Sequence, residues 1–421
     1  MHSIHIRQEA KLVYCQRMDS KITGMTKPSK FLVPMSSPEI NDADRQAVLE
    51  VLHTPILSMG ERIEQFEQQF IEYTGLRNAI GVNSGTTGLH LCVRAAGIGP
   101  DDLVLTTPFS FVASANVLLY ENAIPIFVDV DEQTGNMDIH QTRQAAADLM
   151  EGGVKAYHWL PRKGAGAEGR LKALLGVDVF GQPADLDNLQ QICRDHQIKF
   201  IEDSCEALGA EYKGRKAGTG GDYGVFAFYP NKQITTGEGG MVITNDDQAA
   251  EMMRSLRNQG RAVGDTWLQH TYLGYNYRMD EMSAALGIEQ FKRLDDLIHK
   301  RQQVADAYQE RLSEIPGVQV PCLAPETTKV SWFVYVVHFA DGLDRDRIAT
   351  CLEQEGIPVR PYFLPIHLQP YMVERFGFQE GDFPVTEKLG KNGLALPFSS
   401  VMSEAQVDLV CQKVRQCILA Q

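Results

Sequence analysis

Four stretches of this sequence place groups that could do chemistry just after apolar runs. After AIGV comes NSGTTGLHL, residues 83–91, where a glycine turn and two hydroxyls open a helix whose free N–H groups could bind a phosphate. After LVLT comes Phe111, a flat apolar surface, and after KFIE comes Asp203, a carboxylate at a strand tip. Lys232 follows VFAFY and a proline turn. Taken singly, each has an ordinary structural explanation: a helix cap, a core ring or a solvated charge.

Together, the four groups match what pyridoxal phosphate (PLP) requires of a protein. The helix start would bind the phosphate, and the phenyl ring would cover one face of the pyridine ring. Asp203 would keep the pyridine nitrogen protonated, so that the ring withdraws electrons from the reacting carbon. Lys232 would form a Schiff base with the aldehyde. The sequence therefore predicts a PLP site with Lys232 and Asp203 as catalytic residues.

The elements that position these groups follow from an alternation of short apolar runs with helical patterns. Strands separated by helices predict a largely parallel sheet covered on both faces, with ligands beyond the carboxyl ends of the strands. In one intervening helix, Asp185 is the predicted N-cap, and Leu186, Leu189 and Ile192 form an apolar stripe that should pack on the sheet. The seven apolar runs lie at 79–82, 103–106, 124–130, 173–180, 199–202, 225–229 and 241–244.

The chain is long enough for more than one domain. Its 421 residues exceed what one ordinary core accommodates. We expect an N-terminal extension at 1–30, a segment at 31–55 that joins the small domain, a large PLP-binding domain at 56–294 and a small C-terminal α/β domain at 295–421.

Patterns inside these domains make further predictions. Long helical patterns at 279–314 lead away from the sheet, and WFVYVVHF at 332–339 is typical of a strand. Ser403 and Gln406 have the spacing of a capping box that opens the last helix. The glycine-rich and charged segment 159–172 predicts an inserted surface loop.

Composition restricts the partners. Asp and Glu outnumber Lys and Arg by 54 to 40, giving a net charge of -14 that disfavours general attraction to nucleic acid or an anionic membrane. Neither a charged-then-apolar leader nor an apolar run of about 18 or more residues is present, which predicts neither secretion nor membrane spanning. The eight cysteines are scattered, without CxxC or His/Cys metal spacing, which favours a reducing cytoplasm and predicts no metal site.

A series of segments then connects the chain to a known family. In order, they are NSGTTGLHL, PFSFVASAN, PIFVDVD, VFGQPADL, IEDSCEALGAEYKGR, FAFYPNK with GEGG, LGYNYRMDEMSAALG, PIHLQPY, GDFPVTE and LALPFSS. From about residue 31 to 421 the chain resembles the DegT/StrS family of sugar aminotransferases. The resemblance implies the type I fold of PLP-dependent transferases, an α/β fold with a mostly parallel seven-stranded sheet in the large domain and a smaller C-terminal α/β domain.

The resemblance also implies cofactor-binding roles for individual residues. Lys232 would be the Schiff-base lysine, and Asp203 would pair with the pyridine nitrogen. The Gly85 backbone and the Thr86 and Thr87 side chains would hold the phosphate. Phe111 would stack on the ring.

Other implied roles involve a second subunit and the substrate. In this family the GYNYR segment crosses a dimer interface, so Asn276 and Arg278 would complete the neighbour's phosphate site and the active unit would be a homodimer. By itself, GYNYR is typical of an ordinary loop before a helix, with Arg278 solvated. His367 in PIHLQP falls in a segment that lies near the substrate in relatives. Substrate contact is one hypothesis for His367, and a structural or exposed imidazole is the other.

Two positions depart from the family pattern. Many relatives carry serine five residues before the lysine, whereas this chain has Ala227, so one hydroxyl contact to the phosphate is missing. Glu206 stands three residues after Asp203, where glutamine is common, and adds a possible negative charge among the cofactor-binding residues.

The implied reaction moves an amino group from glutamate or glutamine, through PLP and pyridoxamine phosphate (PMP), to a keto-sugar linked to a nucleoside diphosphate. One site serves both halves, which predicts ping-pong order. Related enzymes that remove a sugar hydroxyl have histidine at the lysine position, so Lys232 favours transamination. The implied pathway class is amino sugar and lipopolysaccharide, O-antigen or other polysaccharide biosynthesis.

Three alternatives stay open at this point. The acceptor could be a cyclitol ketone or an aromatic precursor, which amine formation from candidate ketones would reveal. The chain could be a regulatory protein that binds PLP without turnover, and would then take up PLP without forming PMP. It could also be a purely structural α/β protein, colourless and unaffected by PLP.

Overall fold

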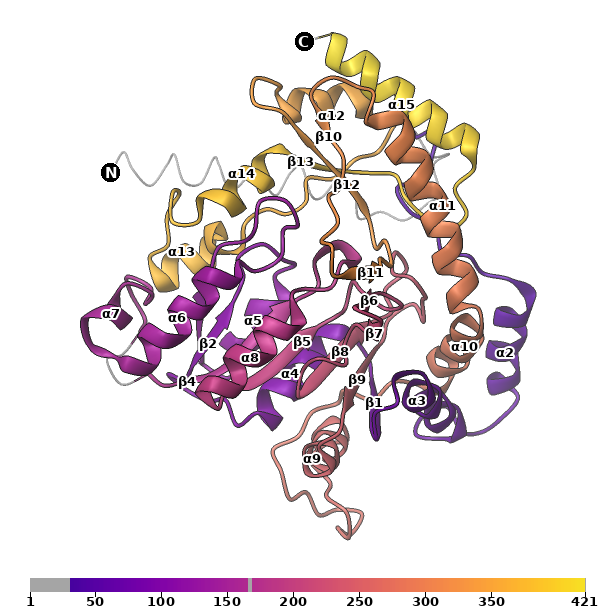
Figure 1. Ribbon diagram of the computed structural model, residues 1–421. Coiled ribbons are helices and arrows are strands. Elements are labelled where there is room, and N and C mark those ends of the chain that lie inside the picture. Colours follow the sequence, from indigo (N-terminus) through magenta and orange to yellow (C-terminus); the bar gives the residue numbers. More distant parts are fainter. Residues whose placement is uncertain (1–30, 166–168, 421) are drawn as a thin grey trace, which may run out of the picture.

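Residues 31–165 and 169–420 are described by the computed structural model, and they form two sheet-based units connected by long helices (Figure 1). The larger sheet has seven strands in the order β1-β9-β8-β5-β4-β2-β3. Only β9 runs antiparallel to its neighbours, so the predicted mostly parallel seven-stranded sheet is confirmed. The strands are β1 (Asn78–Val82), β2 (Leu103–Thr106), β3 (Ile124–Phe127), β4 (Leu171–Val177), β5 (Lys199–Asp203), β8 (Tyr223–Ala227) and β9 (Gly240–Thr244).

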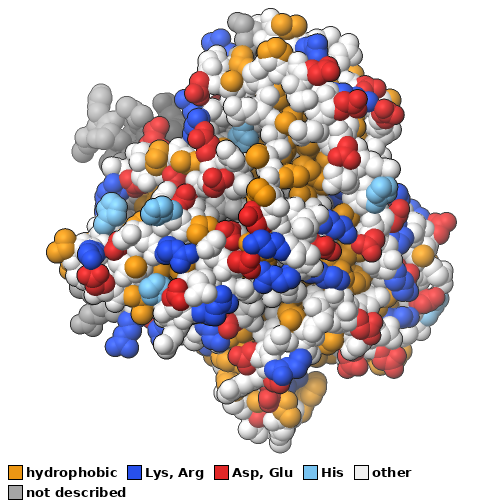
Figure 2. Space-filling model, in the orientation of Figure 1, with side chains coloured by type: hydrophobic (Ala, Val, Ile, Leu, Met, Phe, Trp, Pro, Cys, Tyr) orange, Lys and Arg blue, Asp and Glu red, His pale blue; other side chains and the backbone are white. Residues whose placement is uncertain are grey.

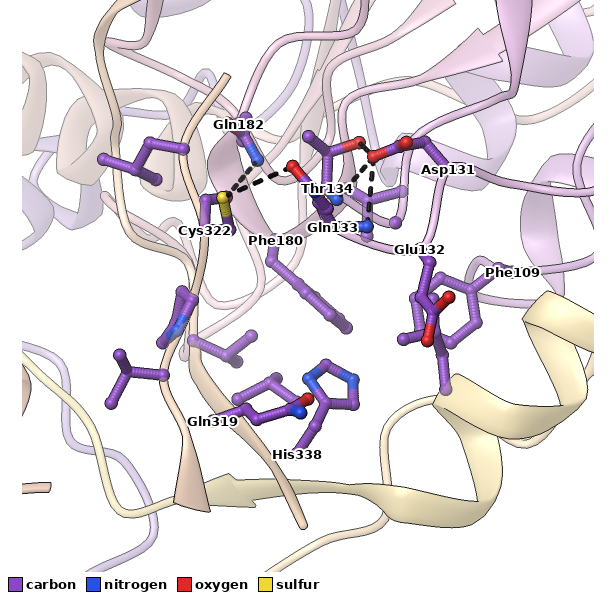
Figure 3. Close-up of a pocket in the computed structure, with 18 of the residues that line it drawn as sticks. Phe109, Asp131, Glu132, Gln133, Thr134, Phe180, Gln182, Gln319, Cys322 and His338 are labelled. Atoms are coloured by element: carbon purple, nitrogen blue, oxygen red, sulfur yellow. Dashed lines mark hydrogen bonds between the residues drawn. The ribbon is translucent and has the colours of Figure 1, made fainter. Parts of the chain in front are cut away.

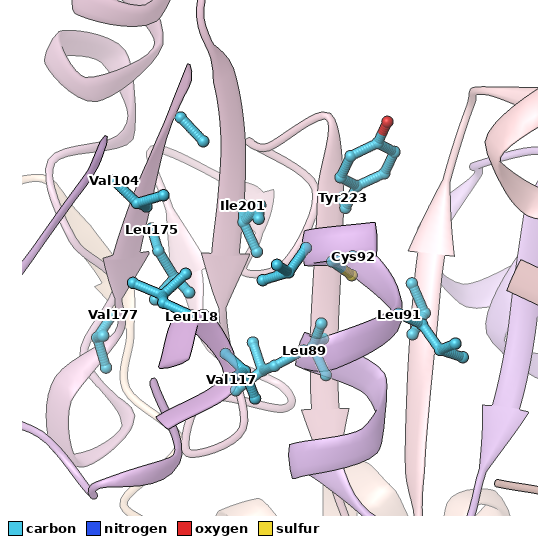
Figure 4. Packing of buried hydrophobic residues seen from close by; sticks show 14 of the residues in the cluster. Leu89, Leu91, Cys92, Val104, Val117, Leu118, Leu175, Val177, Ile201 and Tyr223 are labelled. Carbon is cyan, nitrogen blue, oxygen red and sulfur yellow. The ribbon is translucent and has the colours of Figure 1, made fainter. Parts of the chain in front are cut away.

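Helices cover both faces of this sheet because its strands present apolar side chains on both sides. On one face, Leu89, Val117 and Leu256 come from three helices and pack with Ile201 and other strand residues (Figure 4). On the other face, Ala146 and Leu189 pack against the strands. Helices nearer the sheet edge add further apolar side chains there. The first group is α4 (Gly85–Ala95), α5 (Ala113–Tyr120) and α9 (Asp247–Arg257); the second includes α3 (Glu61–Thr74), α6 (Ile139–Glu151), α8 (Leu186–His196) and α10 (Glu281–Lys292), and the short α7 (Gly153–Tyr157) follows α6.

The smaller unit is an antiparallel sheet backed by helices. Its strands are ordered β10-β12-β13. The predicted strand at 332–339 begins only at Tyr335, because Trp332 adopts a left-handed backbone with φ of 50°. The elements are β10 (Val318–Gln319), β12 (Tyr335–Phe339), β13 (Gly393–Leu396), α11 (Leu294–Leu312), α12 (Arg345–Gln354) and α15 (Glu404–Leu419).

Several elements tie the two units together. A third sheet joins residues near 211–216 to a strand near 328, and the C-terminal third also contributes Ile366, Met372 and Phe376 to the core of the large sheet. The predicted boundary between 294 and 295 stays a prediction. The remaining elements are α2 (Asp42–Leu52), η1 (Val179–Gly181), β6 (Glu211–Tyr212), β7 (Arg215–Lys216), β11 (Thr327–Lys329), η2 (Ile366–Leu368), α13 (Pro370–Phe376) and α14 (Pro384–Asn392).

The N-terminal segment also contacts both parts of the molecule. Val33 packs in the core of the small unit, whereas Ala47 and Val51 of α2 pack against Ala285 of α10. The predicted extension at 1–30 lies outside the described residues, as do 166–168 in the predicted loop 159–172.

Local predictions about helix starts are confirmed. Asp185 caps α8 by accepting a hydrogen bond from the Asn188 N–H, and the apolar stripe of this helix is buried. Ser403 and Gln406 form a capping box at the start of α15. These caps depend only on residues within one turn, which is why the sequence predicts them.

The cysteine prediction missed one feature. Cys351 of α12 and Cys417 of α15 form a disulfide, although they lie 66 residues apart and share no motif. Between residues 31 and 420, apart from the short gap, no helix is long and apolar enough to cross a membrane. The same residues contain no group of three or more His, Cys, Asp or Glu side chains placed to hold a metal ion.

Candidate active site

Three of the predicted chemical groups meet at the carboxyl edge of the large sheet. A Cβ on Gly85 would lie 2.7 Å from the Cβ of Ala227 and 2.8 Å from the Sγ of Cys205. The start of α4 therefore packs directly on the end of β8 and on the turn that follows β5. Since Asp203 ends β5 and Lys232 follows β8, this contact brings the proposed phosphate cradle next to both.

The cradle is a capped helix start. Ser84 is the N-cap, and its side chain accepts a hydrogen bond from the Thr87 N–H. The Thr87 hydroxyl in turn bonds Asn83 Oδ1 at 2.9 Å and the Ser84 carbonyl at 2.8 Å, so it supports the cap. The first-turn N–H groups of Gly85 and Thr86 have no partner within the helix and lie at the positive end of its dipole. Next to Gly85, Ala227 presents a methyl group where a serine hydroxyl could have contacted the phosphate.

Asp203 is fixed in position by uncharged donors. It is 5% exposed, its Oδ2 accepts a hydrogen bond from the Ser114 hydroxyl at 2.7 Å, and its Oδ1 accepts one from the Cys205 N–H at 3.2 Å. Ser114 belongs to the first turn of α5, one turn beyond Phe111. The carboxyl group is thus oriented but keeps acceptor capacity for a further donor.

The side chain of Lys232 is largely enclosed, and its backbone is held by a hydrogen bond. Its Nζ is 3.7 Å from Glu206 Oε1, longer than a hydrogen bond, and 3.7 Å from the centre of the Phe333 ring. Its carbonyl accepts a hydrogen bond of 2.6 Å from the buried Arg301 of α11. Arg301 therefore pins the lysine segment to the long helix between the two units.

Glu206 occupies the wall beside Lys232. Its Oε2 accepts a hydrogen bond from the Phe180 N–H at 3.0 Å, and the residue is buried. Burial raises the pKa of Glu206, and the neighbouring Lys232 ammonium opposes that rise. The departure from glutamine thus places an ionisable group, held by the backbone of η1, 3.7 Å from the lysine amine.

The aromatic and loop residues have mixed placements. Phe111 precedes α5 on the same edge and is 61% exposed, so its ring is open to a ligand or a partner. Asn276 is exposed, and its carbonyl accepts a hydrogen bond from the Asn83 side chain beside the cradle. Arg278 bonds Asn258 at 3.0 Å within the same chain.

The GYNYR segment is anchored by its tyrosines. The Tyr277 hydroxyl lies 3.0 Å from His90 Nδ1 on α4, and the other ring nitrogen of His90 lies 2.8 Å from Glu121. Tyr275 stacks on Tyr277 with ring centres 4.7 Å apart. The two tyrosines face the protein, whereas Asn276 is exposed and Arg278 is half-buried beside Asn258.

His367 lies in the protein interior. Its side chain is fully buried among aromatic rings, and its Nε2 lies 3.0 Å from Glu387 of α14. Substrate contact stays a hypothesis for this residue, and the burial argues against it. In this structure the imidazole fastens η2 to α14.

Three residues near the lysine and aspartate were not predicted from the sequence. Ser114 could have been found, because it follows Phe111 by three residues at the start of a helix and so lies on the same side. Phe333 and Arg301 could not, since they reach Lys232 from the C-terminal third and only the fold brings them there.

Comparison with known proteins identifies the chain's family. The profile of the DegT/DnrJ/EryC1/StrS aminotransferase family matches residues 38–415. The chain belongs to this family. It is therefore a PLP-dependent aminotransferase, as the sequence predicted.

Individual members of the family resemble the chain over nearly its whole length. GDP-perosamine synthase of Caulobacter vibrioides is 36% identical over 391 residues, covering 92% of this chain and 98% of the relative. The spore coat polysaccharide biosynthesis protein SpsC of Bacillus subtilis is 33% identical over 407 residues, covering 94% and 99%. The structure of Helicobacter pylori PseC, an aminotransferase involved in pseudoaminic acid biosynthesis, superposes with a TM-score of 0.81 at 27% identity, covering 92% and 100%.

The residues at the sheet edge fit PLP chemically. A helix start with free N–H groups suits a phosphate, and a buried carboxyl group held by Ser114 suits a protonated ring nitrogen. The amine of Lys232 lies at the same edge and forms a loose ion pair of 3.7 Å with Glu206, which suits a lysine that reacts with an aldehyde.

Proposed function

We propose that this aminotransferase moves an amino group from glutamate or glutamine to a keto-sugar linked to a nucleotide. The likeness to GDP-perosamine synthase over nearly the full length of both chains carries this proposal. The relatives SpsC and PseC are named for polysaccharide and sugar-acid biosynthesis, which supports a sugar acceptor and a place in amino sugar or polysaccharide biosynthesis. The donor follows from the family resemblance of the sequence.

Within the site, Lys232 Nζ is the proposed attachment point of PLP and the group that moves protons. When bound, PLP supplies a carbon that carries the amino group and a ring that withdraws electrons. In each half of the reaction, Lys232 Nζ would move a proton between the substrate carbon that bears the nitrogen and the cofactor carbon that carries the amino group. The Phe333 ring below the amine excludes water from that side.

Asp203 is the proposed holder of the ring-nitrogen proton. The hydrogen bonds from Ser114 and from the Cys205 N–H fix the direction of its free lone pair, which would point at the ring nitrogen. Burial strengthens the interaction of the carboxylate with a protonated nitrogen. Glu206 would sit beside the same ring and accept or release a proton next to Lys232.

The phosphate and the ring face have proposed contacts from both subunits of a homodimer. Gly85, Thr86 and Thr87 would bind the phosphate through the start of α4, and Phe111 would cover the ring. Asn276 and Arg278 would reach the cradle of a second copy. Within one chain Asn276 is exposed and Arg278 is half-buried, on a segment that the two tyrosines anchor; such a reach would exchange the bond of Arg278 to Asn258 for one to the phosphate.

Exposed apolar side chains support this second copy. The loop before GYNYR projects with α9 at the bottom of Figure 1, and the same projection carries hydrophobic side chains in Figure 2. Val263, Trp267, Leu268 and Leu273 are 76–83% exposed there, an apolar concentration that favours burial against a partner. Trp267→Ser with Leu268→Ser should shift the protein toward monomer in analytical ultracentrifugation, whereas Val154→Ser on α7 should not. A monomeric wild-type protein would contradict the proposal.

Two experiments test the function itself. Borohydride reduction of the PLP-loaded protein, followed by peptide mapping, should attach the cofactor to Lys232. The PMP-loaded protein should then regain the PLP spectrum with a nucleotide-linked keto-sugar and not with the free keto-sugar or with cyclitol ketones. Return of the spectrum with a cyclitol ketone alone would replace the sugar acceptor, and label on another lysine would overturn the site. Parallel initial-rate lines are expected for ping-pong order.

We also propose a cytoplasmic location, from the scattered cysteines. The disulfide between Cys351 and Cys417 is the observation against it. Lysis in denaturant with excess alkylating reagent, followed by mass spectrometry of the intact protein, should find all eight cysteines alkylated; two alkyl groups fewer would contradict the proposal.

A further inference from the structure

A second cavity lies on the other side of the wall that carries the neighbours of Lys232. It has a volume of about 500 Å³ and opens between the turn after β3, the segment 319–323, β12 and α14 (Figure 3). Among the residues that line it are Phe109, Phe180 and His338, but neither Lys232 nor Asp203 nor Glu206. It is therefore a separate space from the candidate active site.

One thin wall divides the two spaces. It consists of η1 and residues 331–333, which hydrogen-bond each other from the Ser331 N–H to the Gly181 carbonyl at 3.1 Å and from the Phe333 N–H to the Phe180 carbonyl at 3.3 Å. Trp332 and Phe180 line the cavity. On the opposite side, the Phe333 ring contacts Lys232 and the Phe180 N–H bonds Glu206.

The backbone of this wall is strained at two non-glycine residues. Phe180 and Trp332 have φ angles of 58° and 50°, in the left-handed region that costs large side chains on the order of 1–3 kcal/mol each. Such conformations persist where the surroundings hold them, and they concentrate at ligand sites. Both strained residues line the cavity, and Figure 3 shows Phe180 projecting into it toward His338.

The charged groups around the cavity already have partners. Lys388 forms an ion pair of 2.6 Å with Glu132, and the Asp131 carboxylate accepts hydrogen bonds from the Thr134 N–H and hydroxyl, both at 2.9 Å. Burial lowers the pKa of His338 to about 4, so its imidazole is neutral near pH 7. An anion such as phosphate would find no free cation among the residues that line this cavity.

Uncharged hydrogen-bonding groups nevertheless remain in an aromatic surrounding. The His338 Nε2 is buried without a hydrogen-bond partner among the described residues. Side-chain amides of Gln133, Gln319 and Asn392 also line the space. A plain hydrocarbon would leave these groups unpaired, which costs about 1–3 kcal/mol for each one that it cuts off from water. The lining thus favours a ring with a flat apolar face and polar edges.

We propose that this cavity is a second ligand site that takes an uncharged, flat heterocycle with hydrogen-bonding edges, the chemistry of a nucleobase. Its volume is in the range of ordinary small-molecule sites. The base would lie against Phe180 and Trp332 and form hydrogen bonds with the side-chain amides at its edge. This inference goes beyond the proposed transamination, because the site lies apart from Lys232 and needs no PLP.

Trp332 provides a direct readout of binding. The chain has three tryptophans, so Trp159→Phe with Trp267→Phe leaves Trp332 as the only indole. The double variant is prepared without PLP. Adenosine, guanosine or uridine should then change the fluorescence of Trp332 saturably, while pyrophosphate and benzyl alcohol should not. Absence of a saturable change with all three nucleosides, up to their solubility limits, would overturn the proposal.

Variants locate the binding and separate two sources of the base. Val336→Phe, which fills the cavity, and Gln319→Ala, at its exposed rim, should each weaken nucleoside binding severalfold or more. Val401→Phe at an exposed valine and Lys232→Ala in the candidate active site should not change it. Equal affinity for uridine and uridine diphosphate supports a site for the base alone. Binding of diphosphates without any binding of free nucleosides contradicts it, and failure of transamination would leave these results unaffected.

Discussion

At the scale of single residues, the carboxyl group of Asp203 is held by a serine instead of a cation. An arginine would have drawn the negative charge toward itself, whereas the Ser114 hydroxyl orients the carboxyl group and leaves its charge for the ligand. This arrangement predicts a graded response to substitution.

Asp203→Asn should lower kcat by about 10²-fold or more, because a neutral amide cannot keep the ring nitrogen protonated. Ser114→Ala should lower it by about tenfold, since a hydrogen bond to a charged group contributes about 1.5 kcal/mol. Ser313→Ala, at an exposed serine, is the control. Single-turnover rates with glutamate and PLP dissociation constants measure both effects. Wild-type rates in Asp203→Asn would remove the residue from the proposed role.

Glu206 makes a prediction about pH. Burial raises its pKa in the folded protein above the ordinary value of 4.5, so the unfolded chain releases the proton more readily. The contribution of Glu206 to stability is therefore complete below pH 4.5 and is lost as the pH rises through the raised pKa. Relative to Glu206→Gln, the unfolding free energy of the wild type should fall by up to about 1.4 kcal/mol per pH unit between the ordinary and the raised pKa.

Thermal or denaturant unfolding of the PLP-free protein from pH 4.5 to 7.5 checks the direction. The unfolding free energy of the Glu206→Gln variant should rise relative to that of the wild type as the pH rises, because glutamine does not titrate. Glu374→Gln, at an exposed glutamate, should follow the wild type throughout. A rise in the relative stability of the variant toward low pH would show that the ion pair with Lys232 lowers the pKa of Glu206 by more than burial raises it.

Sequence patterns were informative about residue types but not about their partners. Lys232, Asp203 and the start of α4 meet at one edge because they follow strands of one parallel sheet, which the alternation predicts. The contact of Lys232 with Phe333 and the burial of His367 depend on how the C-terminal third folds back. No spacing within a single segment encodes that.

At the scale of elements, the start of α4 depends on a close approach that only glycine permits. Gly85→Ala places a methyl group 2.7 Å from Ala227 and 2.8 Å from Cys205, so either α4 or β8 must shift. We expect a loss of about 1–3 kcal/mol in unfolding free energy, typical of overpacking, and a larger relative loss of PLP affinity because the cradle itself moves.

Gly99→Ala is the matched control, since no atom lies within 4 Å of its added methyl group. Urea unfolding and PLP titration of both variants measure the two losses. Unchanged PLP affinity in Gly85→Ala would mean that the phosphate binds elsewhere.

The seven apolar runs correspond to the seven strands, but their order in the sheet could not be predicted. The antiparallel β9 inserts between β1 and β8, and this placement depends on apolar packing on both faces. Strand ends also differ, since the run at 124–130 pairs only to Phe127. Short apolar runs therefore predict where strands occur, whereas the order of the strands in the sheet depends on packing between segments that are distant in the sequence.

At the scale of the whole molecule, the small unit reaches the candidate active site through three contacts. Arg301 holds the Lys232 carbonyl, Phe333 lies against its amine, and Ser331 bonds the wall at Gly181. The site is thus assembled between the two units, and a boundary drawn in sequence at 294 separates residues that act together.

The proposed homodimer makes the whole-molecule prediction. If Lys232 of one subunit works with Arg278 of the other, a mixed dimer of Lys232→Ala and Arg278→Ala chains contains one site with both changes and one site with neither. Random reassociation of equal amounts makes about half of the dimers mixed, and each mixed dimer has one intact site.

Two inactive preparations, mixed after mild dissociation, should therefore recover about one quarter of wild-type activity. Differently tagged chains, purified as the mixed dimer, should reach about one half. Mixing Lys232→Ala with Asp203→Ala is the control, because both residues lie at the same edge of one chain and each site of that mixed dimer is damaged. Absence of recovery in the test pair, as in the control, would place Arg278 in its own subunit's site.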